Sequence, residues 1–462
     1  MTLGRTGVFL LVVSLAMPVA MAADVQVVLS SEDGAHKLSP GEPISLRTGG
    51  GRGRNAIAVD PETTHQTMLG MGASWDHATC YNLSLLSDEK REEVITRLVH
   101  PDKGIGMNLM RLCIGTSDFV GEPYYSYDDM PEGKTDPELE HFSIEKDRDY
   151  VLPVVKAALR INPDMLYFAS PWSPPGWMTT NDSMMGGKMK REYYAVYARY
   201  LLKFLRAYTE EGVPVHAMTL QNEPRMVSPD YPTCLWNGED QRDFIRDHLG
   251  PLFEAENEDT RIWCWDHNYN WLKFPRTVLG DPETAKYVDG TAFHFYEGEV
   301  EAMAELKEEF PEKDLFFTEG SAFWTRGAIQ IMGILRNGAR SYNAWVVLLD
   351  ENRKPNRGPH FASPTSIVID SETLEITYRF DYYMYGQFMK YIERGAVRLA
   401  TSGGSRLFDT VAFRNPGGEL VLVAANAESR EKRFTLQCGA RHFRAKVPGK
   451  TVATYRWHLP GE

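Results

Sequence analysis

Short apolar runs alternate with longer amphipathic stretches from about residue 65 to residue 390 of the chain. The short runs have the length of β-strands, whereas the longer stretches repeat apolar residues at helical spacing. The clearest helix is predicted just before Gly212, which occupies the position of a C-terminal cap. Its apolar residues lie on one face at a period of about 3.6: Tyr193, Tyr197, Tyr200, Leu201, Phe204, Leu205 and Tyr208. This alternation predicts βα units and a parallel sheet.

Eight apolar runs in this region each precede a polar or aromatic loop and are predicted to be strands. They are Thr67–Ser74, Asn108–Ile114, Met165–Ser170, Val215–Leu220, Arg261–Trp265, Gly290–Phe295, Leu315–Thr318 and Ser341–Leu349. Eight strands over about 325 residues predict an α/β fold, a (β/α)8 TIM barrel with enlarged loops, since this fold typically takes about 250 residues. A doubly wound open sheet is the alternative. Its nucleotide-binding form is disfavoured, because Gly70-Met71-Gly72 lacks the third glycine of a phosphate-binding turn.

Alternating apolar residues at both ends of the chain predict a second unit made of β-strands. Val25, Val27 and Leu29 alternate near the N-terminus, and short strands separated by turns return between Leu407 and Trp457. We expect the two ends to meet in one β-sandwich attached to the barrel. The predicted organisation is a signal peptide at 1–22, N-terminal sandwich strands at 23–64, the barrel at 65–390 and C-terminal sandwich strands at 391–462.

The first residues have the order of a secretory signal peptide. Arg5 precedes an apolar run from Val8 to Val19, and Ala20-Met21-Ala22 follows as a small-residue cleavage site. The run holds roughly a dozen residues where a membrane span needs about 20, so a stable membrane anchor is disfavoured. We expect cleavage near Ala22 and a secreted or periplasmic protein.

Composition narrows the range of partners. The formal net charge is −13, and no Lys/Arg-rich run stands out that would follow a phosphate backbone. Nucleic acid and anionic membrane surfaces are therefore disfavoured as partners, and a neutral polar substrate fits better. The five cysteines show no CxxC spacing, so we expect buried thiols rather than a zinc site or a dense disulfide framework.

Polar and aromatic residues stand at the carboxyl end of every predicted barrel strand. They are Trp75-Asp76, Arg111, Trp172, Asn222-Glu223, Asp266-His267-Asn268, His294 with Tyr296, Glu319 and Trp345. Barrel enzymes carry their active sites at that end of the strands. Any one of these residues alone would be read as a rim or core residue. Their recurrence at equivalent positions predicts an active site.

Glu223 and Glu319 are the sharpest pair among these residues. Each directly follows a β-rich run, and the two are 96 residues apart in the chain. A βα unit takes about 31 residues, so this separation places the pair on the fourth and seventh strands. Two carboxylates facing each other across a barrel mouth are what hydrolysis of a glycosidic bond requires, and the nearby aromatic residues suit the apolar face of a sugar.

Four motifs in this order resemble the glucosylceramidase-like glycoside hydrolases of family 30, and the resemblance covers nearly all of the chain after residue 22. The motifs are Thr219-Leu220-Gln221-Asn222-Glu223-Pro224, Thr318-Glu319-Gly320-Ser321, the segment Ser170–Met178 and His294-Phe295-Tyr296. The resemblance implies a retaining β-glycosidase with Glu223 as acid/base and Glu319 as nucleophile. Such double displacement needs no metal or organic cofactor.

The resemblance also implies roles for the surrounding residues. Asn222 is expected to bind the sugar 2-hydroxyl, Asp76 and Trp172 the other hydroxyls, and Trp345 to form the floor of the site. The residues expected to orient the nucleophile are Arg111, His294 and Tyr296. Trp75 is bulkier than the residue usual in the family, and we count it among the substrate-binding residues.

Several alternatives remain open at this stage. Members of this family act on glucosylceramide, β-1,6-glucan, β-xylan or β-fucosides. We expect the loops at 116–150 and 181–189 to shape the leaving-group side of the cleft, and a solvated insertion is the alternative interpretation of these loops. We expect a β-linked glucoside, oligosaccharide or polysaccharide, with β-xylosidase, β-fucosidase or xylanase activity as the alternative. One rival from another class is a non-catalytic carbohydrate-binding barrel. Another is a metal-dependent barrel hydrolase, with ligands drawn from Asp76, His77, Asp266, His267 and His294.

Overall fold

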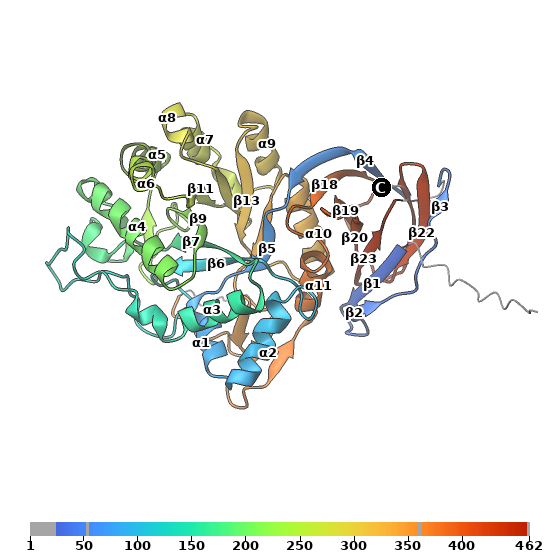
Figure 1. Ribbon diagram of the computed structural model, residues 1–462, viewed down its shortest axis with the longest axis horizontal. Helices are drawn as coiled ribbons and strands as arrows, with labels where there is room; N and C mark the ends of the chain where they lie inside the picture. The colour runs from blue at the N-terminus through green and yellow to red at the C-terminus, as the bar shows by residue number, and fades with distance from the viewer. Residues whose placement is uncertain (1–24, 52–54, 359–362, 460–462) are drawn as a thin grey trace, which may run out of the picture.

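A computed structural model describes residues 25–51, 55–358 and 363–459 of the chain. These residues form a barrel surrounded by helices and, beside it, a curled and mostly antiparallel sheet (Figure 1). The predicted signal peptide at 1–22 lies outside the described residues. Among the helices that are described, none has the length and apolar character needed to cross a membrane.

Eight parallel strands build the barrel. Six of them form one sheet: β6 (Leu109–Ile114), β7 (Leu166–Pro171), β9 (Val215–Thr219), β11 (Arg261–His267), β12 (Gly290–His294) and β13 (Asp314–Glu319). The other two, β5 (Gly70–Ala73) and β14 (Ser341–Ala344), pair with each other. Backbone hydrogen bonds of 2.8 Å, from Trp75 N–H to Arg111 O and from Arg340 N–H to Leu315 O, join this pair to both edges of the six-stranded sheet. The predicted (β/α)8 barrel is confirmed.

The last predicted strand is shorter in the structure than in the sequence analysis. Apolar residues continue from Ser341 to Leu349, but β14 ends at Ala344. The chain then leaves the barrel wall at Trp345, whose N–H donates to Ser321 Oγ at 3.0 Å. Leu348–Asp350 forms β15 of a separate small sheet with β16 (Ile367–Ile369) and β17 (Ile376–Tyr378).

Helices cover the outside of the barrel. They are α1 (His77–Ser84), α2 (Asp88–Val99), α3 (Val151–Ile161), α4 (Tyr194–Glu210), α5 (Gly238–Phe244), α6 (Gly250–Glu256), α7 (Lys273–Leu279), α8 (Pro282–Ala285), α9 (Glu301–Glu309), α10 (Trp324–Arg336) and α11 (Phe380–Met389). The predicted tyrosine-rich helix is α4, whose aromatic stripe is buried. Gly212 follows it at φ +79°, a left-handed conformation that ends a helix readily at glycine.

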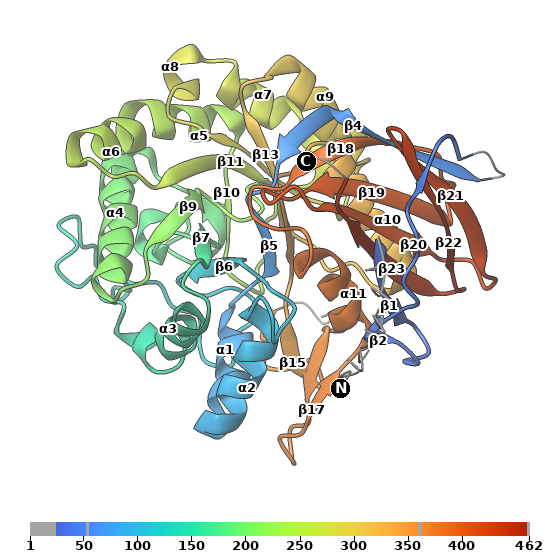
Figure 2. The same ribbon diagram turned by 45° about the vertical axis from the view of Figure 1, so that its right-hand side comes forward.

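The second unit is a ten-stranded sheet with the order β2-β1-β23-β20-β19-β18-β4-β21-β22-β3. Its strands come from both chain ends: β1 (Val25–Ser31), β2 (Lys37–Pro40), β3 (Arg47–Thr48), β4 (Ala56–Thr67), β18 (Val397–Ser402), β19 (Phe408–Arg414), β20 (Leu420–Asn426), β21 (Lys432–Cys438), β22 (Arg441–Val447) and β23 (Thr451–Trp457). The sheet is curled (Figure 2). It encloses its own apolar core, where the ring centres of Phe443 and Tyr455 lie 5.7 Å apart. The predicted sandwich of both chain ends is confirmed.

Helices α10 and α11 lie between the barrel and this sheet (Figures 1 and 2). Gln387 of α11 is fully buried at the contact. Its amide donates to Ser30 Oγ at 2.7 Å, and its side-chain oxygen accepts from Thr454 Oγ1 at 2.6 Å. One side chain of a barrel helix thus binds both β1 and β23, which are neighbours in the sheet but come from opposite ends of the chain.

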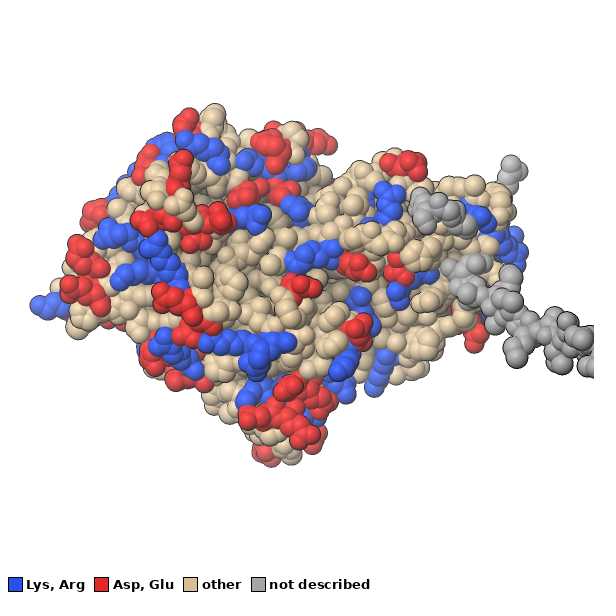
Figure 3. Space-filling model, viewed as in Figure 1, with Lys and Arg blue, Asp and Glu red and all other residues tan. Residues whose placement is uncertain are grey.

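Charged side chains are mixed over the molecular surface. On the face shown in Figure 3, Lys/Arg and Asp/Glu lie interspersed over both units. The five cysteines, Cys80, Cys113, Cys234, Cys264 and Cys438, are all buried and form no disulfide with one another. Packing therefore holds this fold together without covalent cross-links.

Replacing Gln387 tests how strongly the two units depend on this contact. Gln387→Ala removes two buried side-chain hydrogen bonds, those with Ser30 and Thr454, and leaves a cavity at a fully buried position, so we expect the free energy of unfolding to fall by about 1–3 kcal/mol. Chemical denaturation measures this change. Gln26→Ala, at an exposed position of β1, is the matched control and should stay within about 0.5 kcal/mol of the wild type.

Candidate active site

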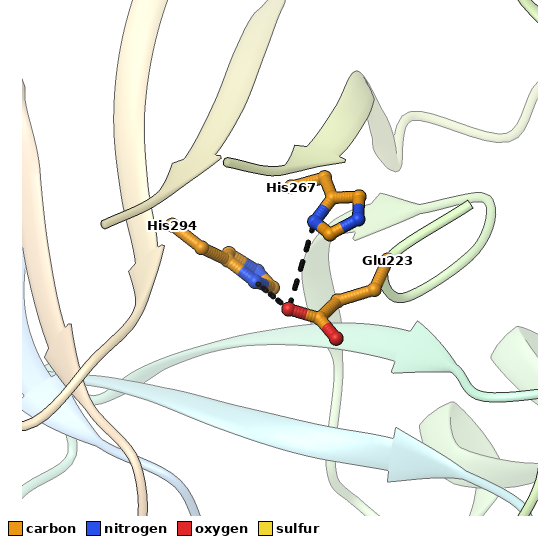
Figure 4. A group of neighbouring side chains, drawn as sticks. All are labelled: Glu223, His267 and His294. Atoms are coloured by element: carbon orange, nitrogen blue, oxygen red, sulfur yellow. Dashed lines mark hydrogen bonds and ion pairs between the residues drawn. The ribbon is translucent and has the colours of Figure 1, made fainter. Parts of the chain in front are cut away.

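The predicted polar residues converge at the carboxyl ends of the barrel strands. Five come from five strands: Arg111 of β6, Glu223 just after β9, Asp266 of β11, His294 of β12 and Glu319 of β13. Figure 4 shows Glu223 and His294 pointing at each other, with the His267 ring beside them. The fourth and seventh strands carry the two glutamates, and this is the end at which barrel enzymes place their chemistry.

Arg111 lies at the centre of the site and is fully buried. Its guanidinium donates to Ser170 Oγ at 3.2 Å, to Asn222 Oδ1 at 2.8 Å and to Asp266 Oδ2 at 2.8 Å. It also donates to Oε2 of Glu319. The planar guanidinium therefore fixes the Glu319 carboxylate and the Asn222 amide relative to each other.

Asp266 is the buried anion that balances Arg111. Its carboxylate accepts hydrogen bonds from Thr219 Oγ1 and Thr318 Oγ1, both at 2.6 Å, in addition to those from Arg111 and His294. Burial by itself would raise the pKa of Asp266, but the charge of Arg111 and the bond from His294 hold that pKa well below its usual range. Asp266 is therefore ionised throughout the working pH range.

His294 connects Asp266 with both glutamates. One ring nitrogen, Nε2, lies 3.0 Å from Asp266 Oδ1, while Nδ1 lies 3.2 Å from Glu223 Oε1 and 3.8 Å from Glu319 Oε1. Burial lowers the pKa of His294, but the Glu319 charge and the bonds to Asp266 and Glu223 raise it to about 9. The ring is therefore a cation at neutral pH that faces three carboxylates.

His267 lies on the other side of Glu223, with Nδ1 3.6 Å from Glu223 Oε1. Burial and the positive charge of His294 lower the pKa of His267 to about 3. This ring is neutral where His294 is charged. Glu223 thus lies between one cationic and one neutral imidazole.

Glu319 is held from a second direction by Tyr296. The tyrosine hydroxyl donates to Glu319 Oε1 at 2.9 Å, and the Tyr296 N–H donates to Asn268 Oδ1 at 3.0 Å. The Tyr296 side chain is half exposed, at 48%. It therefore forms part of the rim while it fixes one oxygen of Glu319.

The backbone is bent sharply where Glu223 enters the site. Glu223 has φ +47° and Asp266 has φ +68°, a left-handed conformation that costs energy for residues with a side chain. The Glu223 N–H donates to the Asp266 carbonyl at 3.0 Å. The two strained residues therefore support each other, and this bond aims the Glu223 side chain at His294.

The positions of the glutamates around His294 limit their separation. The sum of the two distances from Nδ1, 3.2 Å to Glu223 and 3.8 Å to Glu319, is an upper limit for the gap between those oxygens. Inverting glycosidases need about 6.5–9.5 Å between their carboxyl groups, and retaining ones about 5–5.5 Å. This upper limit includes the whole retaining range but only the shortest of the inverting separations, and it therefore favours the retaining geometry.

Aromatic rings form one wall beside this carboxylate pair. The rings of Trp172 and Trp345 stack at 5.0 Å with an interplanar angle of 25°, and Phe119 meets Trp345 edge-on at 5.5 Å. The Arg111 guanidinium lies 4.8 Å from the Trp172 ring centre. The wall is therefore fixed by the same arginine that binds Glu319.

Trp75 and Asp76 follow the first barrel strand, β5. Both are essentially buried, and the Asp76 carboxylate caps α1 by accepting from Ala78 N–H at 3.0 Å and Thr79 Oγ1 at 2.7 Å. Burial raises the pKa of Asp76 to about 7 despite these bonds. The capping role explains an aspartate at this position by itself, and a sugar contact of Asp76 stays a prediction.

Asp118 is a site residue that the sequence analysis did not single out. It lies in the loop after β6, and burial together with the nearby charges of Glu319 and Glu223 raises its pKa well above the usual range. The Gly358 N–H donates to the Asp118 carbonyl at 3.2 Å, and a Cβ at Gly358 would lie 2.3 Å from the Asp118 Cβ. The sequence gives little sign of this role, because Asp118 does not stand at the end of a strand and only follows Arg111 by seven residues.

The geometry gives little support to the metal-dependent hydrolase that the sequence left as an alternative. Glu223, His267 and His294 offer ligand atoms within 4.8 Å of one another. Both nitrogens of His294, however, already face carboxylates, Nε2 that of Asp266 and Nδ1 that of Glu223. His77 lies elsewhere, with Nε2 2.9 Å from the Tyr125 hydroxyl. The five residues considered for such a site are therefore not one ligand set.

Both units of the chain are similar to known domains and proteins. The Glycosyl hydrolase family 30 TIM-barrel domain matches residues 68–387, and the Glycosyl hydrolase family 30 beta sandwich domain matches residues 395–455. An Endo-1,6-beta-D-glucanase of Neurospora crassa is 30% identical over 449 residues, covering 91% of this chain and 92% of the relative. The Lysosomal acid glucosylceramidase of Mus musculus is 31% identical over 453 residues, covering 91% and 86%.

Solved structures agree with these matches. The endo-beta1,6-glucanase BT3312 superposes with a TM-score of 0.86 and 30% identity, over 94% of this chain and 99% of that one. SrfJ from Salmonella typhimurium superposes with a TM-score of 0.88 and 26% identity, over 94% and 100%. Both units of the chain, and their arrangement, therefore recur in known proteins.

The raised pKa of His294 makes stability depend on pH in a defined direction. The unfolded chain releases this proton near about pH 6.5, whereas the folded chain holds it to about 9. The stabilisation is therefore complete below the lower value and is lost as the pH rises through the upper one. We expect the free energy of unfolding to fall by on the order of 3 kcal/mol across this window.

Chemical denaturation at a series of pH values measures this slope. His294→Gln has no titrating ring and should lose the slope between about pH 6.5 and 9. Exposed His458→Gln is the control and should keep the slope. An unchanged slope in His294→Gln would contradict the assignment of the buried cation.

Proposed function

The chain belongs to glycosyl hydrolase family 30, and we propose that it hydrolyses β-linked glucosides with retention of configuration, Glu319 acting as nucleophile and Glu223 as acid/base. Membership of this family makes it a glycoside hydrolase. We further propose residues 65–390 as the catalytic unit. The proposal rests chiefly on one observation, that two glutamates in different surroundings meet at the same nitrogen of His294.

The surroundings support different roles for the two glutamates. Glu319 accepts from Arg111 and Tyr296, so both of its oxygens are stabilised as a carboxylate and held in one orientation. Glu223 has neighbouring imidazoles and no arginine contact among the described residues. A fixed anion suits the nucleophile, and a carboxyl group beside polarisable imidazoles suits a group that gives and regains a proton.

The proposed reaction takes two displacements. In the first, a carboxylate oxygen of Glu319 attacks the anomeric carbon, the bond to the leaving oxygen breaks, and that oxygen takes the proton of Glu223. In the second, Glu223 removes a proton from water, the water oxygen attacks the anomeric carbon, and the ester bond to Glu319 breaks. Each displacement inverts the centre once, so the product retains the β configuration.

The sugar that loses its glycosidic bond is proposed to lie against the aromatic wall. Trp172 and Trp345 present apolar rings beside Glu319, while Asn222, held by Arg111, offers its amide N–H groups to the 2-hydroxyl. Two 1,6-β-glucanases and a glucosylceramidase are among the relatives named above, and because all three names specify a β-glucosyl unit, we place such a unit at this position. Similarity to xylanases is at or below 22% identity and shows the fold alone.

The leaving-group side is proposed to include Trp271. Its side chain is 45% exposed, and the guanidinium of Arg225, two residues after Glu223, lies 4.9 Å from its ring centre. Arg225 is itself fixed by donating to Asn237 Oδ1 at 2.7 Å. An exposed, immobilised ring beside the acid/base gives a second sugar a flat apolar surface, which favours an oligosaccharide or polysaccharide substrate.

We also propose that the chain is exported, with cleavage near Ala22. The support is the order of Arg5, the apolar run from Val8 to Val19 and the small residues at 20–22.

Azide rescue assigns the two glutamates. Glu319→Gly should lower kcat on an aryl β-glucoside by at least about 10³-fold while the chain keeps the circular dichroism spectrum of the wild type. Azide then fills the space of the lost carboxylate and should yield the α-glycosyl azide. The matched variant Glu223→Gly should yield the β-glycosyl azide, because there the nucleophile is intact. The opposite pairing of products would reverse the roles, and an inert wild type would favour the non-catalytic barrel.

Substitution of Trp271 tests the leaving-group side. Trp271→Ala should lower kcat/KM on β-1,6-linked gluco-oligosaccharides about fivefold, as expected for losing about 1 kcal/mol of ring contact. Activity on an aryl β-glucoside, which lacks the second sugar, should change little. Trp271→Phe keeps an aromatic ring and is the control. Equal losses on both substrates would mean that Trp271 supports the fold rather than the second sugar.

A further inference from the structure

The long loop between β6 and α3 holds a cluster of ionisable residues outside the catalytic centre. Asp128, Asp136 and His141 each offer one ligand atom, and these atoms all lie within 4.8 Å of one another. Asp128 and Asp136 are buried, whereas His141 is exposed. The cluster therefore has a closed carboxylate side and one side open to solvent.

Asp128 is the unusual member of this cluster. It is 1% exposed, and none of the described residues donates a hydrogen bond to either of its carboxylate oxygens. Its neighbour Asp129 is different, since that carboxylate accepts from the N–H and hydroxyl of Ser126. A buried carboxylate without donors is costly unless a proton or a cation neutralises it.

Asp136 brings a second negative charge to the same place. Its Oδ2 accepts from the His141 N–H at 2.8 Å and lies 2.9 Å from His141 Nδ1. No lysine or arginine forms an ion pair with Asp128 or Asp136 among the described residues. Two carboxylate side chains thus face each other with a single imidazole, an arrangement that a divalent ion would complete.

We propose that Asp128, Asp136 and His141 bind one divalent transition-metal ion. Two carboxylates and one imidazole are a mixed oxygen and nitrogen set that suits Zn²⁺ or Mn²⁺, whereas Ca²⁺ prefers oxygen ligands alone. The exposed side of His141 leaves room for water as the remaining ligands. The ion replaces the hydrogen-bond donors that Asp128 lacks.

The ion would act on the loop rather than on the reaction. The Asp128 carbonyl accepts from Trp177 Nε1 at 2.9 Å, and Trp177 belongs to the same Ser170–Met178 segment as Trp172 of the aromatic wall. Next to Asp128, the Tyr127 ring stacks on Phe204 of α4 at 5.8 Å. Binding at Asp128 therefore fastens the loop to α4 and to the segment that carries the wall.

Metal titration of the untagged full chain tests the proposal. After chelator treatment and dialysis, ZnCl₂, MnCl₂ and CaCl₂ are added separately, and calorimetry and the melting temperature are recorded. We expect one Zn²⁺ or Mn²⁺ per chain and a higher melting temperature on binding. Hydrolysis of an aryl β-glucoside well below the melting temperature should not depend on the ion, which separates this site from a catalytic metal.

Variants in the same loop sharpen the test. His141→Ala alters an exposed side chain and should weaken binding at least about tenfold while the chelated chain melts as before. Asp128→Asn should abolish binding, and the matched Asp129→Asn should retain it. Saturable binding of none of the ions, of Ca²⁺ alone, or equal binding by His141→Ala would overturn the proposal. In the first case the two carboxylates share a proton.

Discussion

Two glutamates can lie side by side at the mouth of this barrel because positive charge is buried beneath them. The Arg111 guanidinium and the His294 imidazolium face the carboxyl groups of Glu223, Glu319 and Asp266. Removing any member would leave a buried charge without its partner. The positions of Asn222 and the Trp172 ring follow from the same arginine. The chemistry of the site and the closure of the barrel thus share one ionic network.

The fold could be predicted from the sequence because each barrel strand has its own short apolar run and its own polar end. The spacing of Glu223 and Glu319 placed them on the fourth and seventh strands, and β9 and β13 lie there. The sandwich could also be predicted, since alternation of apolar residues occurs at both chain ends. Regular local patterns were therefore sufficient for the architecture and for the residues at strand ends.

Features set by long-range contacts were beyond sequence reasoning. The apolar run from Ser341 to Leu349 gives no sign of its break at Trp345, which a bond to Ser321 imposes. Asp118 joins the site from inside a loop, where periodicity offers no marker. The capping bonds of Asp76 depend on where α1 begins. Burial and pairing in three dimensions, rather than residue type, decide these roles.

The pairing of β1 with β23 imposes an order on the folding of the chain during its synthesis. β1 hydrogen-bonds along its whole length to β23, so this edge of β1 stays unpaired until β23 has been synthesised. β4 likewise lies between β18 and β21. The ten-stranded sheet can therefore be completed only after the barrel segment between β4 and β18 has been synthesised.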